Sequence, residues 1–409
     1  MKRVLFLSIA LCVAATGAFA QKKAVSQAQS IAKGDKADYA EARTLIKGAL
    51  ENQETKEDPK TWYVAGYVED QQFSGERMKE LLGQQPNQPV MYQALLNILP
   101  YMEKAYELDQ LPDAKGRVRP KHLKDIKGIL SANHIYYINA GAYYFDERDY
   151  KSAYNAFEQY IKISELPMFA GEQTAAKDSN YMTVQFYCGV AATQVGDPQK
   201  AIAALNRAKG YAYRQSDTYE YLYMEYDQLK DTANMEAIAK EAFSLFPNDS
   251  RYVQYLINIY IYTNRNEDAI DYLNKIIASQ PDNAQYYDVL GGVYESGLKD
   301  IENAEKNYAK ALELNPDYVE SLSNLGRIYY NQAISIQGDA NMLTDNKKYQ
   351  EELARAKSLF EKSRPYFEKA HQLKPEQREY LVALRGIYYN LDMGKEFEEI
   401  EAKLNSTQE

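Results

Sequence analysis

The sequence predicts an all-α fold, a right-handed superhelical solenoid in which antiparallel helix pairs stack one after another. The first observation is a recurrence: Leu256 and Leu290 are 34 residues apart. The second is that Pro281 and Pro316 close the two copies 35 residues apart, because one residue is inserted in the turn near Gly297. A period of this length is typical of repeat proteins whose unit is one helix pair.

Each helix pair is predicted from apolar residues that recur at helical spacing. The stripe of the first helix has the i, i+3, i+4, i+7 pattern of one buried face. Its members are Val253, Leu256, Ile257 and Tyr260. Residues 264–266 (NRN) read as a turn, a second stripe starts at Ala269, and Pro281 ends that helix. Such a pair cannot bury both faces alone and must stack on a neighbour. The alternative is an ordinary helical bundle, and five matching landmarks in adjacent repeats argue against it.

The first 20 residues read as a secretory signal peptide. Lys2 and Arg3 precede an apolar run over 4–13, and Ala18–Ala20 is a small-x-small cleavage site. A membrane anchor is the alternative, but the run is too short. A lipoprotein would need lipidated Cys12, which lies inside the run after a bulky leucine. We expect export across the inner membrane, to the periplasm or an outer-membrane-associated site.

Charge and cysteine content narrow the class of partner. The formal net charge is −10, and it becomes −12 when Lys2 and Arg3 are removed with the signal peptide. This argues against nucleic acid or an anionic membrane surface as partner. No later segment is long and apolar enough for an integral membrane span. Cys188 is then the single remaining cysteine, so no internal disulfide is expected.

The N-terminal part, residues 21–133, departs from the regular repeat. We expect an irregular segment over 21–38, a second-helix segment over 39–50 and, from Trp62 and Gly66, the start of a first helix. A loop at 84–89 precedes a helix over 91–109. The basic loop 111–120 (LPDAKGRVRP) is the predicted hinge to the main array.

Two hairpins are predicted to be enlarged, one near each end. The segment ILPYMEKAYEL at 98–108 recurs as SRPYFEKAHQL at 363–373, with Pro100 aligned to Pro365. Pro375 follows Pro316 by 59 residues, and the extra residues fall at 331–362. A proline within such a pattern either kinks a helix or lies in its first turn.

These landmarks divide the chain into four parts. Residues 1–20 are the signal peptide, and 21–133 form a divergent repeat-like helical region. Residues 134–390 form the repeat array, with an enlarged hairpin at about 326–375. Residues 391–409 are a C-terminal capping helix and tail, in which Phe397, Ile400 and Leu404 face inward and glutamates face solvent.

The repeats resemble the tetratricopeptide-repeat family, on the Leu–Gly–x–x–Tyr, Ala and Pro landmarks over most of the chain. The FAQ-like cleavage site, DPKTWY and PYFEKA also resemble secreted members of that family from Bacteroidota. The resemblance implies that the first helices line a concave groove that holds peptides or proteins.

The candidate binding residues are those predicted to face this groove. They lie on successive first helices, on the stripe beside the core stripe. They are Glu220, Tyr221, Met224, Arg251, Gln254, Tyr255, Asn258, Gln285, Asp288, Asn324, Arg327 and Tyr330. Members of the family that clamp a C-terminal carboxylate use Lys, Asn and Arg, whereas this sequence has Glu220, Gln254 and Asp288. The acidic, tyrosine-lined groove therefore predicts a basic or mixed ligand.

The sequence contains no recognisable catalytic or metal-binding pattern. His122, His134 and His371 have no metal-ligand spacing, and no phosphate-binding loop, nucleophile elbow or HExxH motif occurs. Cys188 takes the position of a packed helix residue. We therefore expect no enzyme activity, no cofactor and no metal.

The sequence favours a non-enzymatic protein- or peptide-binding scaffold or adaptor in the cell envelope. Two alternatives stay open: a carbohydrate-binding protein that stacks sugars on its many tyrosines, and a chaperone-like envelope protein. Tyrosines clustered on one flat patch would favour sugar, whereas tyrosines spread along a groove would favour peptide.

Overall fold

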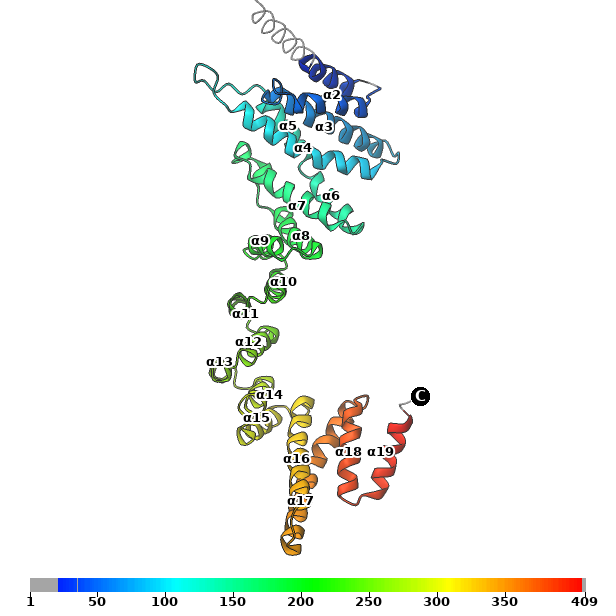
Figure 1. Ribbon diagram of the computed structural model, residues 1–409, viewed down its shortest axis with the longest axis vertical. Helices are drawn as coiled ribbons and strands as arrows, with labels where there is room; N and C mark the ends of the chain where they lie inside the picture. Colours follow the sequence, from blue (N-terminus) through cyan, green and yellow to red (C-terminus); the bar gives the residue numbers. More distant parts are fainter. Residues whose placement is uncertain (1–20, 35, 407–409) are drawn as a thin grey trace, which may run out of the picture. The chain divides into compact units, whose positions relative to one another are not determined.

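The computed structural model describes residues 21–34 and 36–406, which form helices joined by short connections and contain no strand (Figure 1). The predicted signal peptide lies outside the described residues. The chain divides into two compact units: unit 1 ends at Phe246, and unit 2 begins at Pro247. The predicted all-α class is confirmed, and each unit is a stack of helix pairs.

Unit 1 opens with a helix over 21–33. It continues with α2 (Tyr39–Glu51), α3 (Pro59–Leu81), α4 (Gln88–Asp109), α5 (Leu123–Asn133), α6 (Tyr136–Asp146), α7 (Tyr150–Glu165), two 3₁₀ turns (Pro167–Phe169 and Gln173–Ala175), α8 (Ser179–Val195), α9 (Pro198–Ala208), α10 (Gln215–Gln228) and α11 (Thr232–Leu245). Unit 2 contains α12 (Ser250–Tyr262), α13 (Asn266–Ser279), α14 (Ala284–Gly292), the π-helix η3 (Val293–Leu298), α15 (Ile301–Leu314), α16 (Val319–Ala340), α17 (Asn346–Leu373), α18 (Arg378–Asn390) and α19 (Gly394–Ser406).

Aspartates set the starts of many of these helices. In each case the carboxylate accepts a hydrogen bond from a backbone N–H of the first turn, which the helix itself leaves unpaired. The capping aspartates are Asp38, Asp58, Asp149, Asp178, Asp197, Asp231, Asp249, Asp300 and Asp345. Part of the acidic surplus of the chain therefore caps helices.

The short turns inside the helix pairs share one conformation. The residue that precedes the N-cap of the second helix has positive φ, as at Arg148, Gly196, Lys230 and Lys299. Each of these is followed directly by a capping aspartate. This left-handed residue reverses the chain in a minimal number of residues, which keeps the paired helices in contact.

Unit 1 has a continuous core that runs from Val25 to Ala204. Two expectations are corrected by it. Residues 21–33 are helical instead of irregular, because Val25, Ala28 and Ala32 share one buried face. The loop 111–120 was predicted as a hinge to the main array. It is exposed, but core residues from both sides of it belong to one cluster, and the two units divide after Phe246 instead.

Pro100 lies inside α4 and Pro365 inside α17, so neither is in a first turn. A proline cannot donate the helical hydrogen bond to the carbonyl four residues earlier, which for Pro100 is that of Leu96. In unit 1 this carbonyl instead accepts a hydrogen bond of 2.9 Å from the buried Gln159 Nε2 of α7. Beside it, the carbonyl of Leu95 accepts one of 3.0 Å from Tyr137 Oη of α6. The next helix pair is thereby fixed to the long α4.

In unit 2 the inserted residue of the α14–α15 repeat has a definite place. It was predicted in the turn near Gly297, and the chain there forms the π-helix η3 over Val293–Leu298. A π-helix takes one more residue per hydrogen-bonded loop than an α-helix. The helix thus absorbs the insertion, and the packing landmarks on either side keep their register.

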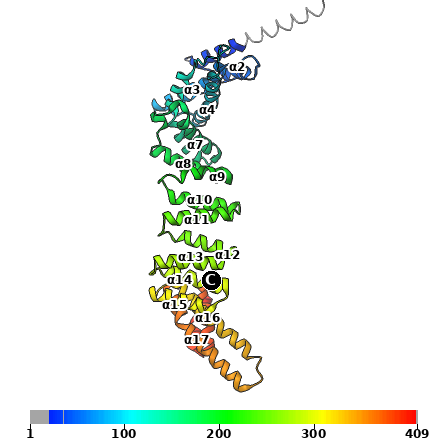
Figure 2. The ribbon, with the colours of Figure 1, turned by 90° about the vertical axis from the view of Figure 1, so that its left-hand side faces the viewer.

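Both predicted enlarged hairpins are present, as α3–α4 and as α16–α17. The extension of α16–α17 is held by buried Ala333, Ala340, Ala356 and Phe360. Figure 2 shows the yellow and orange ends of this hairpin projecting beyond the other helices of unit 2. Of the three residues of α19 predicted to face inward, Ile400 and Leu404 are buried and Phe397 is half-buried. That α19 acts as a cap stays a prediction.

Candidate functional site

A cavity lined by three of the predicted groove residues lies between α16 and α18. It has a volume of about 440 Å³, and we call it the α16–α18 pocket. Helix α16 contributes Ser323, Asn324, Arg327 and Tyr330 to its wall, and Phe367 of α17 contributes its ring. Helix α18 supplies the opposite wall, which is formed by Glu379, Tyr380, Val382 and Ala383. Three predicted binding residues, Asn324, Arg327 and Tyr330, are thus brought together.

Two small residues shape this pocket. A β-carbon on Gly326 would be 3.0 Å from the Phe367 ring, so glycine lets α17 approach α16 closely. A β-carbon on Gly386 would collide with the Tyr330 hydroxyl. Tyr330 can therefore reach across to α18 and close one end of the cavity.

The charge of Arg327 is already neutralised inside the protein. Its guanidinium holds both Glu295 oxygens, at 2.5 and 2.9 Å, and donates to Asn324 Oδ1 at 3.1 Å. Tyr308 Oη also donates to Glu295, at 2.9 Å. Hydrogen bonding to Glu295 raises the pKa of Arg327. Such a bidentate pair has fixed geometry, so Arg327 presents an oriented edge of its guanidinium to the pocket.

Asp288 is engaged within the protein as well. Its Oδ1 accepts hydrogen bonds from Ser321 Oγ at 2.7 Å and from Asn324 Nδ2 at 3.3 Å. Burial raises the pKa of Asp288, and these two hydrogen bonds oppose that rise. Asp288 of α14 is therefore hydrogen-bonded to two side chains of α16.

The other predicted residues are spread over both units and make local contacts. Gln254 donates to Asn258 at 2.8 Å on α12, and Arg251 pairs with the capping Asp249. On α10 of unit 1, Tyr221 packs edge-on against Phe186, Met224 is exposed and Glu220 is half-buried. Tyr255 packs edge-on against Tyr252. Gln285 lines a separate cavity of about 700 Å³. Whether any of these residues binds a partner stays a prediction.

A second pocket, in unit 1, was missed by sequence reasoning. It lies between α6 and α8, has a volume of about 220 Å³, and we call it the α6–α8 pocket. Its lining is largely apolar and includes Ile138, Ala142, Phe145 and Tyr187.

The two pockets occupy the same register. Three lining residues of α6, Ile138, Ala142 and Phe145, lie three residues before, one after and four after Gly141. Ser323, Arg327 and Tyr330 of α16 lie at the same three positions relative to Gly326. The aromatic wall comes from equivalent residues too, Phe157 and Phe367. Aligning α6 with α16 in the sequence would have revealed the pocket. Ile138, Ala142 and Phe145 are apolar, whereas the side chains that face a groove are usually polar.

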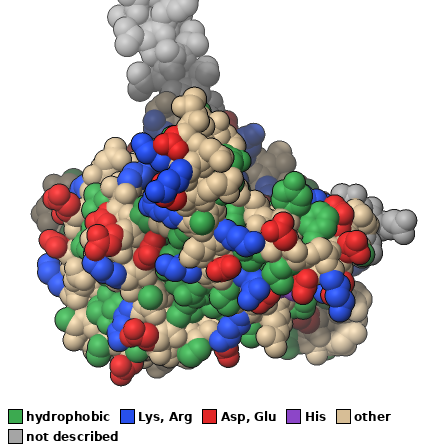
Figure 3. Space-filling model, turned by 90° about the horizontal axis from the view of Figure 1, so that it is seen from below, with side chains coloured by type: hydrophobic (Ala, Val, Ile, Leu, Met, Phe, Trp, Pro, Cys, Tyr) green, Lys and Arg blue, Asp and Glu red, His purple; other side chains and the backbone are tan. Residues whose placement is uncertain are grey.

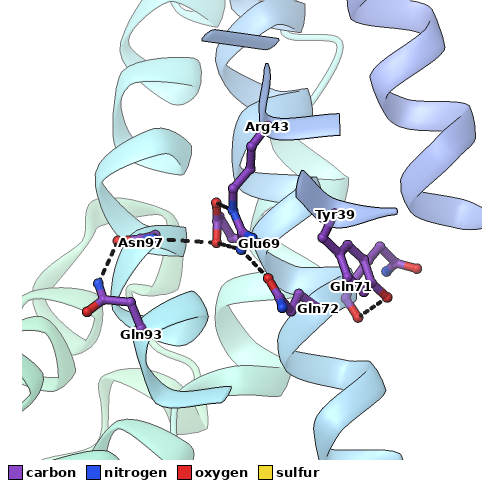
Figure 4. A network of polar contacts seen from close by, with 7 residues as sticks. All are labelled: Tyr39, Arg43, Glu69, Gln71, Gln72, Gln93 and Asn97. Carbon is purple, nitrogen blue, oxygen red and sulfur yellow. Dashed lines mark hydrogen bonds and ion pairs between the residues drawn. The ribbon is translucent and has the colours of Figure 1, made fainter. Parts of the chain in front are cut away.

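Figure 4 shows a polar cluster among α2, α3 and α4 of unit 1. Arg43 donates to both oxygens of the buried Glu69, at 2.7 and 2.6 Å, and also contacts Gln72. Asn97 Nδ2 lies 3.4 Å from Glu69, and Tyr39 donates to the Gln71 carbonyl. Glu69 follows Gly66 by three residues, where other repeats have the landmark tyrosine. The cluster therefore serves to stack the divergent N-terminal helices.

The tyrosine surplus is used mainly for packing. Of the 38 tyrosines, which all lie in the described residues, only Tyr262 and Tyr389 are exposed. Tyr252, Tyr286 and Tyr308 are among the largest fully buried side chains.

Basic and acidic side chains are interspersed on the face in Figure 3, where no large area carries one sign.

Neither a metal site nor a reactive nucleophile is apparent in the part of the chain that the structure covers. No group of three or more His, Cys, Asp or Glu is placed there to hold a metal ion. Cys188 is fully buried beside Glu158, and burial raises the pKa of its thiol. His134 is stacked on Tyr160 and hydrogen-bonded to its backbone carbonyl.

Among the described helices, none has the length and hydropathy needed to cross a membrane.

Comparison with known proteins places one segment in a family. Residues 298–332, which begin at the last residue of η3 and cover all of α15 and the first part of α16, match the family model described as "TPR repeat". No curated protein matches the chain.

Solved structures with similar helix stacks include three tetratricopeptide-type proteins. A TPR repeats protein from Bacteroides fragilis is 20% identical over 63% of this chain and 98% of its own, with a TM-score of 0.34. MamA from Desulfovibrio magneticus is 17% identical over 45% and 97%, with a TM-score of 0.29. YrrB, described as a TPR protein with an unusual peptide-binding site, is 15% identical over 49% and 96%, with a TM-score of 0.32. Similarity this low does not extend to a common function.

Proposed function

We propose that this chain, whose residues 298–332 match the tetratricopeptide-repeat model, is a non-enzymatic scaffold of the cell envelope that holds a peptide segment of another protein. Proteins of this family are generally scaffolds for protein interactions. The envelope location rests on the signal-peptide pattern of residues 1–20. The use of the groove rests on the geometry of unit 2.

The observation that carries the proposal is the α16–α18 pocket. It combines apolar walls at Phe367, Val382 and Ala383 with polar groups at Asn324 and Arg327. A mostly apolar cavity with a few oriented polar groups is the usual character of a binding site. The hydrogen bonds of Arg327 to Glu295 and Asn324 hold these polar groups in place before any partner binds.

The carbohydrate alternative has less support. Stacking on sugar rings needs aromatic faces that are open to solvent and gathered on one patch. The two exposed tyrosines, Tyr262 and Tyr389, lie on different helices of unit 2, and the other tyrosines are buried or half-buried.

The proposal can be tested by site-specific photo-cross-linking. A benzoylphenylalanine at Val382, in the pocket wall, would be compared with one at Ile334, which is similarly exposed on the hairpin extension. We expect one or two envelope proteins to be captured through Val382 and not through Ile334. The same proteins captured at both positions, or none, would contradict the groove assignment. A diffuse set of unfolded clients would support the chaperone-like alternative instead.

A further inference from the structure

The α16–α18 pocket contains one carboxylate that the protein leaves uncompensated. Glu379, in the first turn of α18, is exposed and lines the pocket. It forms no hydrogen bond or ion pair within the described residues. The one basic residue in the lining, Arg327, is paired with Glu295. Arg378 precedes Glu379 in the chain but is not part of the lining. Among the charged side chains that line the pocket, Glu379 is therefore the one without a partner of opposite charge.

The other walls suit a long side chain with an apolar stem. Phe367, Val382 and Ala383 offer hydrocarbon surface, and Tyr330 offers an aromatic ring. Lysine and arginine pack their methylene groups against apolar surface while the charged end stays solvated or paired. A cation can also gain from the face of a tyrosine ring.

From these observations we infer that the α16–α18 pocket is a subsite for one basic side chain, Lys or Arg, of the bound peptide. The aliphatic stem lies along Phe367 and Val382, and the charged end meets the Glu379 carboxylate. This inference rests on the proposed function, since it assigns the chemistry of the same groove.

An acidic ligand is the opposite possibility, because Arg327 also lines the pocket. The bidentate contact with Glu295 leaves that guanidinium with little net charge to offer. A carboxylate entering the pocket would meet Glu379 without a free cation in the wall. The negative charges of the ligand carboxylate and of Glu379 would repel each other within the pocket. Charge complementarity therefore favours a basic side chain as the ligand.

The test begins with random dodecapeptides displayed on phage and selected on the immobilised protein. Enriched peptides are synthesised, and each Lys is replaced by norleucine and each Arg by citrulline, which keep the length and remove the charge. Affinities are measured for the parent protein, for Glu379→Gln, and for Glu398→Gln as the control. Glu398 is an exposed glutamate on α19 away from the pocket.

We expect one basic position whose neutral replacement weakens binding by about fivefold to tenfold. Glu379→Gln should weaken the unmodified peptide by a similar factor and abolish the further effect of the replacement, while Glu398→Gln changes nothing. An equal effect of the replacement in parent and Glu379→Gln proteins would overturn the subsite, as would enriched peptides without a basic residue. If no peptide is enriched on the parent protein, the proposed peptide-binding function itself fails.

Discussion

The side-chain amide of Gln159 in α7 donates to the backbone carbonyl of Leu96 in α4 at 2.9 Å. This carbonyl is free to accept because Pro100 has no N–H to offer it. We predict that Gln159→Leu, which keeps the volume and removes the donor, lowers the free energy of unfolding of unit 1 by about 1–3 kcal/mol, because a buried carbonyl loses its partner. Urea unfolding followed by circular dichroism measures this.

Pro100→Ala provides the control for that prediction. An alanine at this position brings back the helical N–H, so Leu96 regains a partner within α4. The loss caused by Gln159→Leu should therefore be smaller in the Pro100→Ala background. Equal losses in both backgrounds would mean that the stabilising role of Gln159 does not depend on the proline.

Close approach of the helices in a pair depends on Gly141. A β-carbon there would be 2.6 Å from Phe157 Cδ1, and Phe157 lies against the α6–α8 pocket. We predict that Gly141→Ala destabilises unit 1 by about 1–3 kcal/mol, since overpacking outweighs the gain in helix propensity.

Gly128 is the matched glycine for this substitution. It lies in α5, and a β-carbon there would meet nothing within 4 Å. Gly128→Ala should raise stability by about 0.5–1 kcal/mol. If thermal unfolding shows the same sign for Gly128→Ala and Gly141→Ala, the close-packing explanation is wrong.

The fold could be predicted because its signals are local in sequence. The spacing of Leu256 and Leu290 and the closing prolines define each pair without any long-range information. The helix over 21–33 was missed because its buried face consists of Val25 and two alanines in a polar segment. The π-helix was not predicted, because one extra residue lengthens the distance between the repeat landmarks equally whether it lies in the turn or inside the helix.

The candidate site was predictable only in part. The register placed Asn324, Arg327 and Tyr330 on one stripe of a single helix, and all three line the α16–α18 pocket. That they bind a partner stays a prediction. The contacts of Arg327 with Glu295 and of Asp288 with Ser321 were not predicted. In each contact the two residues are more than 30 positions apart in the sequence and belong to different helices. Glu379 was not singled out, because its importance depends on which neighbouring charges are already paired.

The ion pair of Arg43 with Glu69 holds α2 on α3 in the part of unit 1 where the landmark tyrosine is missing. Glu69 is almost fully buried, while Arg43 is partly exposed. Arg43→Met would leave a buried carboxylate without its cation, and we expect a loss of about 2–3 kcal/mol after allowance for the exposure of Arg43.

Glu69→Gln should restore much of the stability in the Arg43→Met protein. A glutamine removes the uncompensated charge and can still accept from Asn97, which now lies 3.4 Å from Glu69. Calorimetry of the single and double variants gives the comparison. A double variant that is no more stable than Arg43→Met would show that lost packing, and not charge, causes the effect.

Asp288 provides a prediction about pH. Burial raises its pKa in the folded state, whereas the unfolded chain has a pKa of about 3.9. The folded state then binds the proton more tightly, so the contribution of this group to stability is greatest at low pH and falls as pH rises from about 4 through the raised value. Asp288→Asn keeps an acceptor for Ser321 and Asn324 and cannot ionise. We therefore expect the variant to equal or exceed the parent in the melting temperature of unit 2 at pH 7.

The advantage of Asp288→Asn should shrink as the pH is lowered toward 4, because the parent carboxyl group becomes protonated there. Other carboxylates titrate in both proteins and cancel in the difference. Asp271→Asn, which changes an exposed carboxylate on α13, should leave the melting temperature nearly unchanged across the range. A clear loss for Asp288→Asn at pH 7 would instead mean that Ser321 and Asn324 bind the charged carboxylate strongly enough to offset its burial. That result would reverse the assigned sign of the pH dependence.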